Sequence, residues 1–185
     1  YSCITLLLTY IPDNVKFFSA KKAETFVLDD IQVTLHGHSY KQRDMMDNLA
    51  AGYPEPVEGT FNIGVLHTGL GGYAAHASYA PCSIEQLKAK GYDYWALGHI
   101  HQQEILHENP HIIFSGNLQG RHIAEQGAKG AVLISIQDNA LVHMEWIYPD
   151  VVRWKKLELD LTSCQSREDI RPIFEKVMLD TVEQE

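Results

Sequence analysis

The alternation of apolar and polar residues predicts short strands in the first third of the chain. Strand-like runs cover residues 15–18, 24–28 and 32–36, and Asp29 and Asp30 are typical of a tight turn between the last two. We expect residues 2–8 to form the end of a helix and residues 42–50 a short helix.

Two mostly apolar runs, residues 61–67 and 92–97, predict strands that are buried on both faces. Between them, Ser83 is suited to cap a helix over residues 84–90 that ends at Gly91. Further strands are expected at residues 104–107, 112–115, 131–137 and 141–148. This order of elements favours a mixed sheet in a layered α/β domain.

The pattern changes after residue 150. A strand-like run covers residues 151–161, and a charged amphipathic segment follows over residues 166–185, where Ser166 and Asp169 have the spacing of a capping box. A strand and a helix alone bury too little surface to make a core. We therefore expect residues 1–150 to be part of one domain and residues 151–185 to begin a second module.

The composition changes this picture mainly through charge. At 45% hydrophobic and 21% charged residues, the 185-residue chain has the composition of a globular protein. Fifteen Lys and Arg against 24 Asp and Glu give a net charge of −9, which excludes a broad basic surface that holds nucleic acid by charge alone. We therefore expect any phosphate-binding site to take its positive charge from a source other than Lys and Arg.

Cysteine usage and the apolar runs point to a cytoplasmic protein without membrane contact. Three separated cysteines, Cys3, Cys82 and Cys164, support neither a disulfide framework nor a cysteine-based zinc site. The apolar run over residues 4–11 is too short to cross a bilayer.

Histidines at strand ends are the main chemical feature. If strand geometry continues past residue 97, His99 and His101 face the same side, and His67 ends the other buried strand. Parallel strands end at one edge of a sheet, and neutral imidazoles bind divalent metals. A lone His-x-His is also found among ordinary surface histidines. His36 and His38 are expected to be structural or surface residues.

Residues 61–121 resemble calcineurin-like metallophosphoesterases. The resemblance is carried by residues 65–68, 79–82, 90–101 and 116–122, and above all by the sequence Gly98-His99-Ile100-His101. Within that superfamily the chain resembles the DNA-repair exonuclease branch (SbcD and YhaO type) over about residues 11–161. The resemblance implies an α/β fold: the C-terminal part of a four-layered α/β/β/α sandwich with mixed sheets, followed by the start of a capping module that positions DNA.

The resemblance also implies a metal centre. Such enzymes hold two divalent ions, commonly manganese, and here His67 and His99 would serve one metal and His101 the other. The family's Asp-x-His, Gly-Asp and Gly-Asn-His-Asp motifs are absent, and with them the acid that protonates the leaving group. We expect these upstream of Tyr1, so that this chain is a fragment that is inactive alone.

Four further residues are candidates for substrate binding. Asn117 and Arg121 lie in a glycine-flanked loop, where an amide and a guanidinium are suited to contact a DNA backbone. A tight turn with a solvated arginine explains that loop equally well. His76 and Tyr79, in the loop after His67, are candidates for lining the substrate groove, although an exposed His76 is the simpler interpretation.

The leading functional hypothesis is metal-dependent phosphodiester hydrolysis by a DNA exonuclease in DNA repair. One alternative is a phosphoesterase that acts on nucleotides or phosphoproteins, because this fold serves many substrates. Another is a non-catalytic scaffold that binds a metal or a partner. The resemblance implies DNA and an SMC-like ATPase subunit as partners, and a homodimer is left open.

Overall fold

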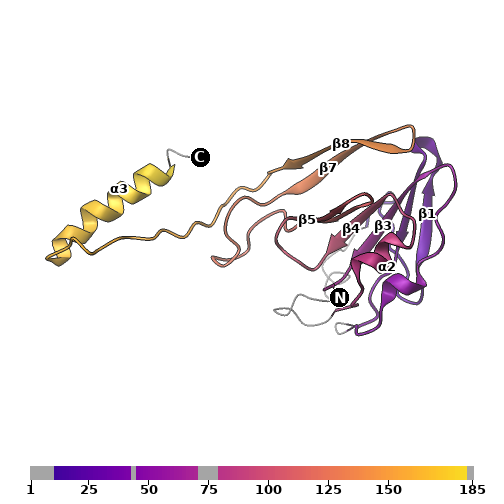
Figure 1. The fold of residues 1–185 in the computed structure, drawn as a ribbon, viewed down its shortest axis with the longest axis horizontal. Coiled ribbons are helices and arrows are strands. Elements are labelled where there is room, and N and C mark those ends of the chain that lie inside the picture. The colour runs from indigo at the N-terminus through magenta and orange to yellow at the C-terminus, as the bar shows by residue number, and fades with distance from the viewer. Residues whose placement is uncertain (1–10, 43–44, 71–78, 183–185) are drawn as a thin grey trace.

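A six-stranded mixed sheet forms the centre of the fold, and a two-stranded sheet packs on one of its faces (Figure 1). The computed structural model describes residues 11–42, 45–70 and 79–182. The strands are β1 (Glu24–Leu28), β2 (Val33–Gly37), β3 (Phe61–His67), β4 (Tyr94–Gly98), β5 (Glu104–Glu108), β6 (His111–Phe114), β7 (Ala131–Gln137) and β8 (Ala140–Ile147). The helices are α2 (Ile84–Lys88) and α3 (Ile170–Val182), with 3₁₀ turns η1 (Asp29–Ile31), η2 (Leu49–Gly52) and η3 (Arg167–Asp169).

Parallel pairing brings the ends of the buried strands together. The strand order is β1-β2-β3-β4-β6-β5, with β2, β3, β4 and β6 parallel and the two outer strands antiparallel to their neighbours. In this register His67, the last residue of β3, lies opposite Gly98, the last residue of β4. The residues that follow these strands therefore meet at one edge, which is where open α/β sheets bind ligands.

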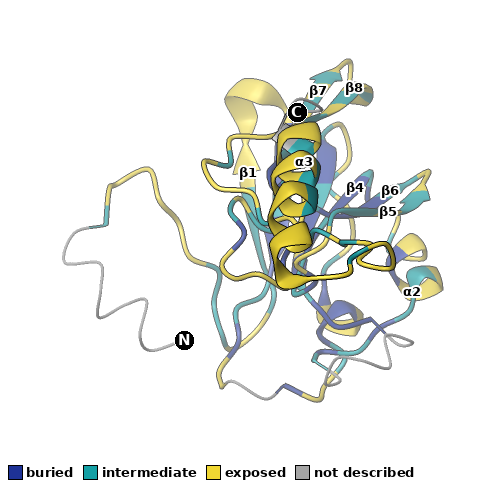
Figure 2. Cartoon of the chain, turned by 90° about the vertical axis from the view of Figure 1, so that its left-hand side faces the viewer, coloured by how far each residue is buried: buried dark blue, intermediate teal, exposed yellow. Residues whose placement is uncertain are grey.

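Each face of the central sheet is covered by a different layer. On one face, Trp95 of β4 packs with Leu87 of α2 and Leu49 of η2. On the other, Phe61 and Tyr94 pack against apolar side chains of β7 and β8. Figure 2 shows the buried residues concentrated on the central strands. This arrangement confirms the mixed α/β architecture predicted from the two apolar runs.

Helix α2 begins as its sequence predicts. The Ser83 hydroxyl accepts a hydrogen bond from the backbone N–H of Gln86 at 3.2 Å, and the Gln86 side chain accepts one from the Ser83 N–H at 2.9 Å. This reciprocal capping box satisfies donors that would otherwise have no partner in the first helical turn.

Several predicted elements differ from the structure. The run 151–161 is not a strand, because no strand among the described residues pairs with it, and Val151 is 90% exposed. Residues 15–18 are also irregular. In the described part of 42–50 the chain forms only the start of η2. The helix expected over 2–8 lies outside the described residues.

Helix α3 stands apart from both sheets, at the end of an extended segment (Figure 1). The predicted capping box of Ser166 and Asp169 belongs to the turn η3 that precedes this helix, where the Ser166 N–H donates to the Asp169 carboxylate at 2.8 Å. Phe174, Met178 and Leu179 on this helix are exposed. The division of the chain at residue 150 stays a prediction. No helix in the described part of the chain has the length and apolar character needed to cross a membrane.

Candidate metal centre

His67 and His99 are brought together by the pairing of β3 with β4. Nδ1 of His99 lies 3.2 Å from Nε2 of His67, so that one imidazole donates a hydrogen bond to the other. Gly98 permits this approach, because a Cβ at that position would lie 3.1 Å from Nδ1 of His67. The Tyr40 hydroxyl donates to the His67 carbonyl and ties the end of β3 to the segment after β2.

The spacing of these two nitrogens fits a shared divalent metal. At a metal–nitrogen distance of about 2.1 Å and a ligand angle of about 90–110°, as in zinc sites, two nitrogen ligands lie about 3.0–3.4 Å apart. Burial, together with repulsion from His99 and His101, lowers the pKa of His67 to about 4. His67 is therefore a neutral imidazole at neutral pH, which is the form that binds metals.

His101 lines the same pocket, but the backbone that leads to it is not the extended strand that was predicted. The expectation that strand geometry continues through residue 101 is wrong, because β4 ends at Gly98 and His99 has a φ of 113°. A positive φ is unfavourable for a residue with a side chain, and such strain is characteristic of functional sites. Ile100 is still buried as expected, at 7% exposed.

The three histidines line one pocket but form two donor groups. A pocket of about 520 Å³ is lined by His67, His99, Ile100, His101, Gln102, Arg121, His122, Ala124, Glu125 and Lys129. Within the described ranges, no three or more His, Cys, Asp or Glu side chains are arranged to hold a single ion. The pair of His67 and His99 and the single His101 are therefore separate groups of nitrogen atoms, and their role as metal ligands stays a prediction.

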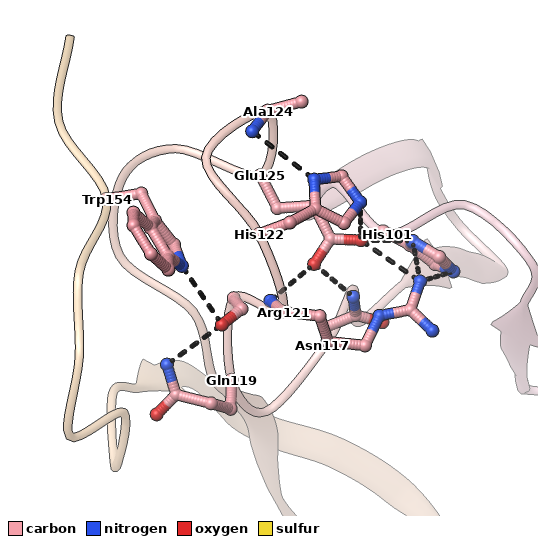
Figure 3. Close-up of polar contacts among 9 residues, drawn as sticks. His101, Asn117, Gln119, Arg121, His122, Ala124, Glu125 and Trp154 are labelled. Carbon is pink, nitrogen blue, oxygen red and sulfur yellow. Dashed lines mark hydrogen bonds and ion pairs between the residues drawn. The ribbon is translucent and has the colours of Figure 1, made fainter.

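Glu125 is the polar centre of the loop beside His101 (Figure 3). Its Oε1 accepts hydrogen bonds from Nδ1 of His101 at 2.7 Å and from the Arg121 guanidinium at 3.0 Å. Its Oε2 accepts from the Arg121 backbone N–H at 2.8 Å and from the Asn117 amide at 3.1 Å. The Arg121 backbone N–H first, and then its guanidinium, hold the pKa of Glu125 far below its usual range.

Sequence reasoning missed Glu125. The only local signal is its spacing of four residues from Arg121, which is common among ordinary surface ion pairs. Its contact with His101 joins residues 24 positions apart, and no short motif records such a pairing.

The predicted substrate-binding residues have different surroundings. Asn117 and Arg121 both donate to Glu125, and Arg121 also lines the pocket. The Tyr79 ring packs against His99, with ring centroids 4.9 Å apart. His76 lies outside the described residues. The roles of these four residues toward a substrate stay predictions.

Two cationic side chains of this chain line the pocket. Arg121 and Lys129 both line it, and Lys129 is only 2% exposed. Glu125, which pairs with Arg121 at 3.0 Å, lines the same pocket, and the expectation about the source of positive charge at a phosphate-binding site stays a prediction. Net charge describes the whole surface, whereas a pocket depends on the few charges that line it.

His36 lies away from this pocket and is part of the sheet. It is fully buried, and its ring is stacked on Tyr92 with centroids 4.3 Å apart. Nδ1 is 3.0 Å from the Thr25 hydroxyl, and Nε2 is 3.0 Å from Oδ1 of Asn62. These contacts agree with the structural role expected for it.

A curated protein similar to this chain is the "Uncharacterized metallophosphoesterase YhaO" of Bacillus subtilis (strain 168). The two sequences are 37% identical over an alignment of 159 residues that covers 84% of this chain. The chain spans 39% of the length of that relative. A comparison with protein-family models found no match.

Proposed function

The similarity to a metallophosphoesterase supports that family for this chain, and from this premise we propose that the chain supplies part of the metal centre of a metal-dependent phosphoesterase. The observation that carries the proposal is the pair of imidazole nitrogens, 3.2 Å apart, at the carboxyl ends of adjacent parallel strands. His101 adds a further donor in the same pocket. The sheet arrangement accords with the C-terminal part of a metallophosphoesterase.

Each side chain has a distinct part in this proposal. His67 and His99 would hold one divalent ion, and His101 would contribute to a second. Manganese is the proposed metal, because the enzymes that this chain resembles commonly use it. When bound, such ions supply Lewis-acid charge that polarises a phosphoester and makes a water molecule acidic enough to attack near neutral pH. Arg121 offers a guanidinium to the non-bridging oxygens of the phosphoester. Tyr79 packs against the His99 ring and limits its movement.

We propose DNA as the substrate, in an exonuclease that acts in DNA repair with an SMC-like ATPase as partner. This part of the proposal is supported by the resemblance of about residues 11–161 to that branch of the superfamily. The two cationic side chains in the pocket, Arg121 and Lys129, are compatible with a phosphodiester and let an acidic chain bind one locally.

The test uses the full-length protein with Mn²⁺, offered linear DNA and, separately, a chromogenic phosphodiester. We expect His99→Ala and His101→Ala to abolish hydrolysis of both, because each removes a nitrogen ligand. His143→Ala is the matched control, since its side chain is 59% exposed on β8. Near-normal turnover in His99→Ala would refute the metal assignment. Turnover of the chromogenic ester without DNA degradation would refute DNA as the substrate.

A further inference from the structure

The Glu125 carboxylate is nearly covered and has only donors around it. Its side chain is 9% exposed. His101 and the Arg121 guanidinium donate to one oxygen, and the Arg121 backbone N–H and the Asn117 amide donate to the other. Figure 3 shows these donors converging on Glu125 from two segments of the chain. An ionised carboxylate accepts about four hydrogen bonds, so this set is complete.

This arrangement determines which nitrogen of His101 carries the proton. A carboxylate can only accept, so Nδ1 of His101, 2.7 Å from Oε1, must be the N–H. A neutral imidazole has one N–H, and Nε2 is then left with its lone pair.

The Arg121 guanidinium does not compete for this proton. One of its nitrogens lies 2.8 Å from Nδ1 and 3.2 Å from Nε2 of His101. The two ring nitrogens point away from each other in the ring plane, so an atom close to both lies against the face of the ring. The guanidinium thereby packs on the imidazole and restricts its rotation.

We infer that Glu125 is a positioning residue of the metal centre: it keeps His101 in the Nδ1–H form, so that Nε2 serves as the metal ligand, and it holds Arg121 against the same ring. The inference rests on the proposed function for the role of Nε2, whereas the protonation pattern of His101 is independent of it. Hydrogen bonds from metal-ligating histidines to carboxylates have this orienting effect in general.

The substitution Glu125→Gln tests the inference sharply, because it nearly preserves size and shape. Both oxygens of the native carboxylate face two donors, but the Arg121 guanidinium on the Oε1 side belongs to a side chain that is 60% exposed and can move, whereas the Arg121 backbone N–H on the Oε2 side cannot. The Gln carbonyl is therefore expected to face the Oε2 side. Its amide group then faces Nδ1 of His101 and can only donate. Nδ1 must therefore accept, and the proton of His101 moves to Nε2.

The first measurement is the tautomer of His101 in the metal-free full-length protein, from long-range ¹H–¹⁵N NMR spectra of the imidazole ring. We expect Nδ1–H in the wild type and Nε2–H in Glu125→Gln. Glu145→Gln is the matched control, because Glu145 forms an exposed pair with His143 at 3.8 Å and lines no part of the pocket. An Nε2–H form in the wild type would overturn the inference even if the variant failed to fold, and so would an unchanged tautomer in Glu125→Gln.

The second measurement is Mn²⁺ binding by calorimetry. Loss of an orienting carboxylate typically weakens metal affinity about 10–100-fold, and we expect a change of that size in Glu125→Gln and none in Glu145→Gln. Equal affinity in Glu125→Gln and the wild type would overturn the inference. If the wild type shows Nδ1–H but binds no divalent metal, the proposed function fails, while the effect of Glu125 on the His101 ring is upheld.

Discussion

A substitution at His36 tests how the stability of the fold depends on pH. Asn62 uses its side-chain N–H groups to donate to the backbone carbonyls of Val57 and Thr60, and its Oδ1 accepts from the Val57 N–H. The orientation of the amide is thereby settled, and Oδ1 faces Nε2 of His36. His36 therefore donates through Nε2, and in the neutral ring Nδ1 accepts from the Thr25 hydroxyl.

The sign of the pH effect follows from burial. Burial lowers the pKa of His36 from 6.5, and the hydrogen bond to Asn62 offsets this only in part. In the unfolded chain the ordinary pKa returns. As pH falls below about 6.5, the unfolded state therefore takes up a proton that the folded state does not, and stability is lost. One such group lowers the free energy of unfolding by at most about 1.4 kcal/mol per pH unit, and it has no effect well above pH 6.5.

The assay is urea denaturation of the full-length protein at pH 7.5 and pH 5.5, for the wild type and His36→Gln. The variant has no titrating ring but keeps a polar amide that can pair with Asn62. Other titrating groups contribute equally to both proteins and cancel in the comparison. We expect the wild type to lose more stability on acidification than the variant. The same loss in both proteins would refute the assignment of His36 as a buried neutral imidazole.

Three further outcomes test the packing, the loop and the metal. Leu87→Ala should lower the free energy of unfolding by about 2–5 kcal/mol, because Leu87 is fully buried. Leu118→Ala, at a residue that is 61% exposed, should change it by less than about 0.5 kcal/mol. Similar losses for the two variants in urea denaturation would contradict the assigned core. Trp154→Ala removes the indole N–H that donates to the Gly120 carbonyl at 3.3 Å. We expect the free energy of unfolding to fall by about 1 kcal/mol and Mn²⁺ binding, measured by calorimetry, to weaken. Unchanged Mn²⁺ affinity would show that this contact does not support the metal centre. Mn²⁺ at 100 times its Kd should stabilise the wild type by about 2.7 kcal/mol, as measured by thermal unfolding with and without chelator. His99→Ala should lose this stabilisation by Mn²⁺. If the variant keeps it, His99 is excluded as a ligand.

The sequence predicted those parts of the fold whose signals are local. Residues 61–67 form β3 and residues 131–137 form β7, with the predicted bounds. The Ser83 cap of α2 is also where its sequence places it. Burial on both faces, alternation and capping each depend on residues a few positions apart, so they can be recognised in the sequence.

Long-range pairing explains what the sequence did not predict. The run 151–161 has strand-like composition but no partner strand in the part of the chain that the structure describes, and a strand depends on its neighbour for its hydrogen bonds. Glu125 was missed because its role comes from His101, which is distant in the chain. The backbone of His99 departs from strand geometry even though its side chain reaches the expected pocket.

The sequence by itself determined the mixed α/β class, the two buried strands and the histidines at their ends. Only the tertiary structure decided that His67 and His99, 32 residues apart, lie within 3.2 Å, and that Glu125 and Arg121 complete the surroundings of His101. The physical reason is that periodicity and capping determine each element separately, whereas a site at a sheet edge depends on which strands become neighbours and in which register.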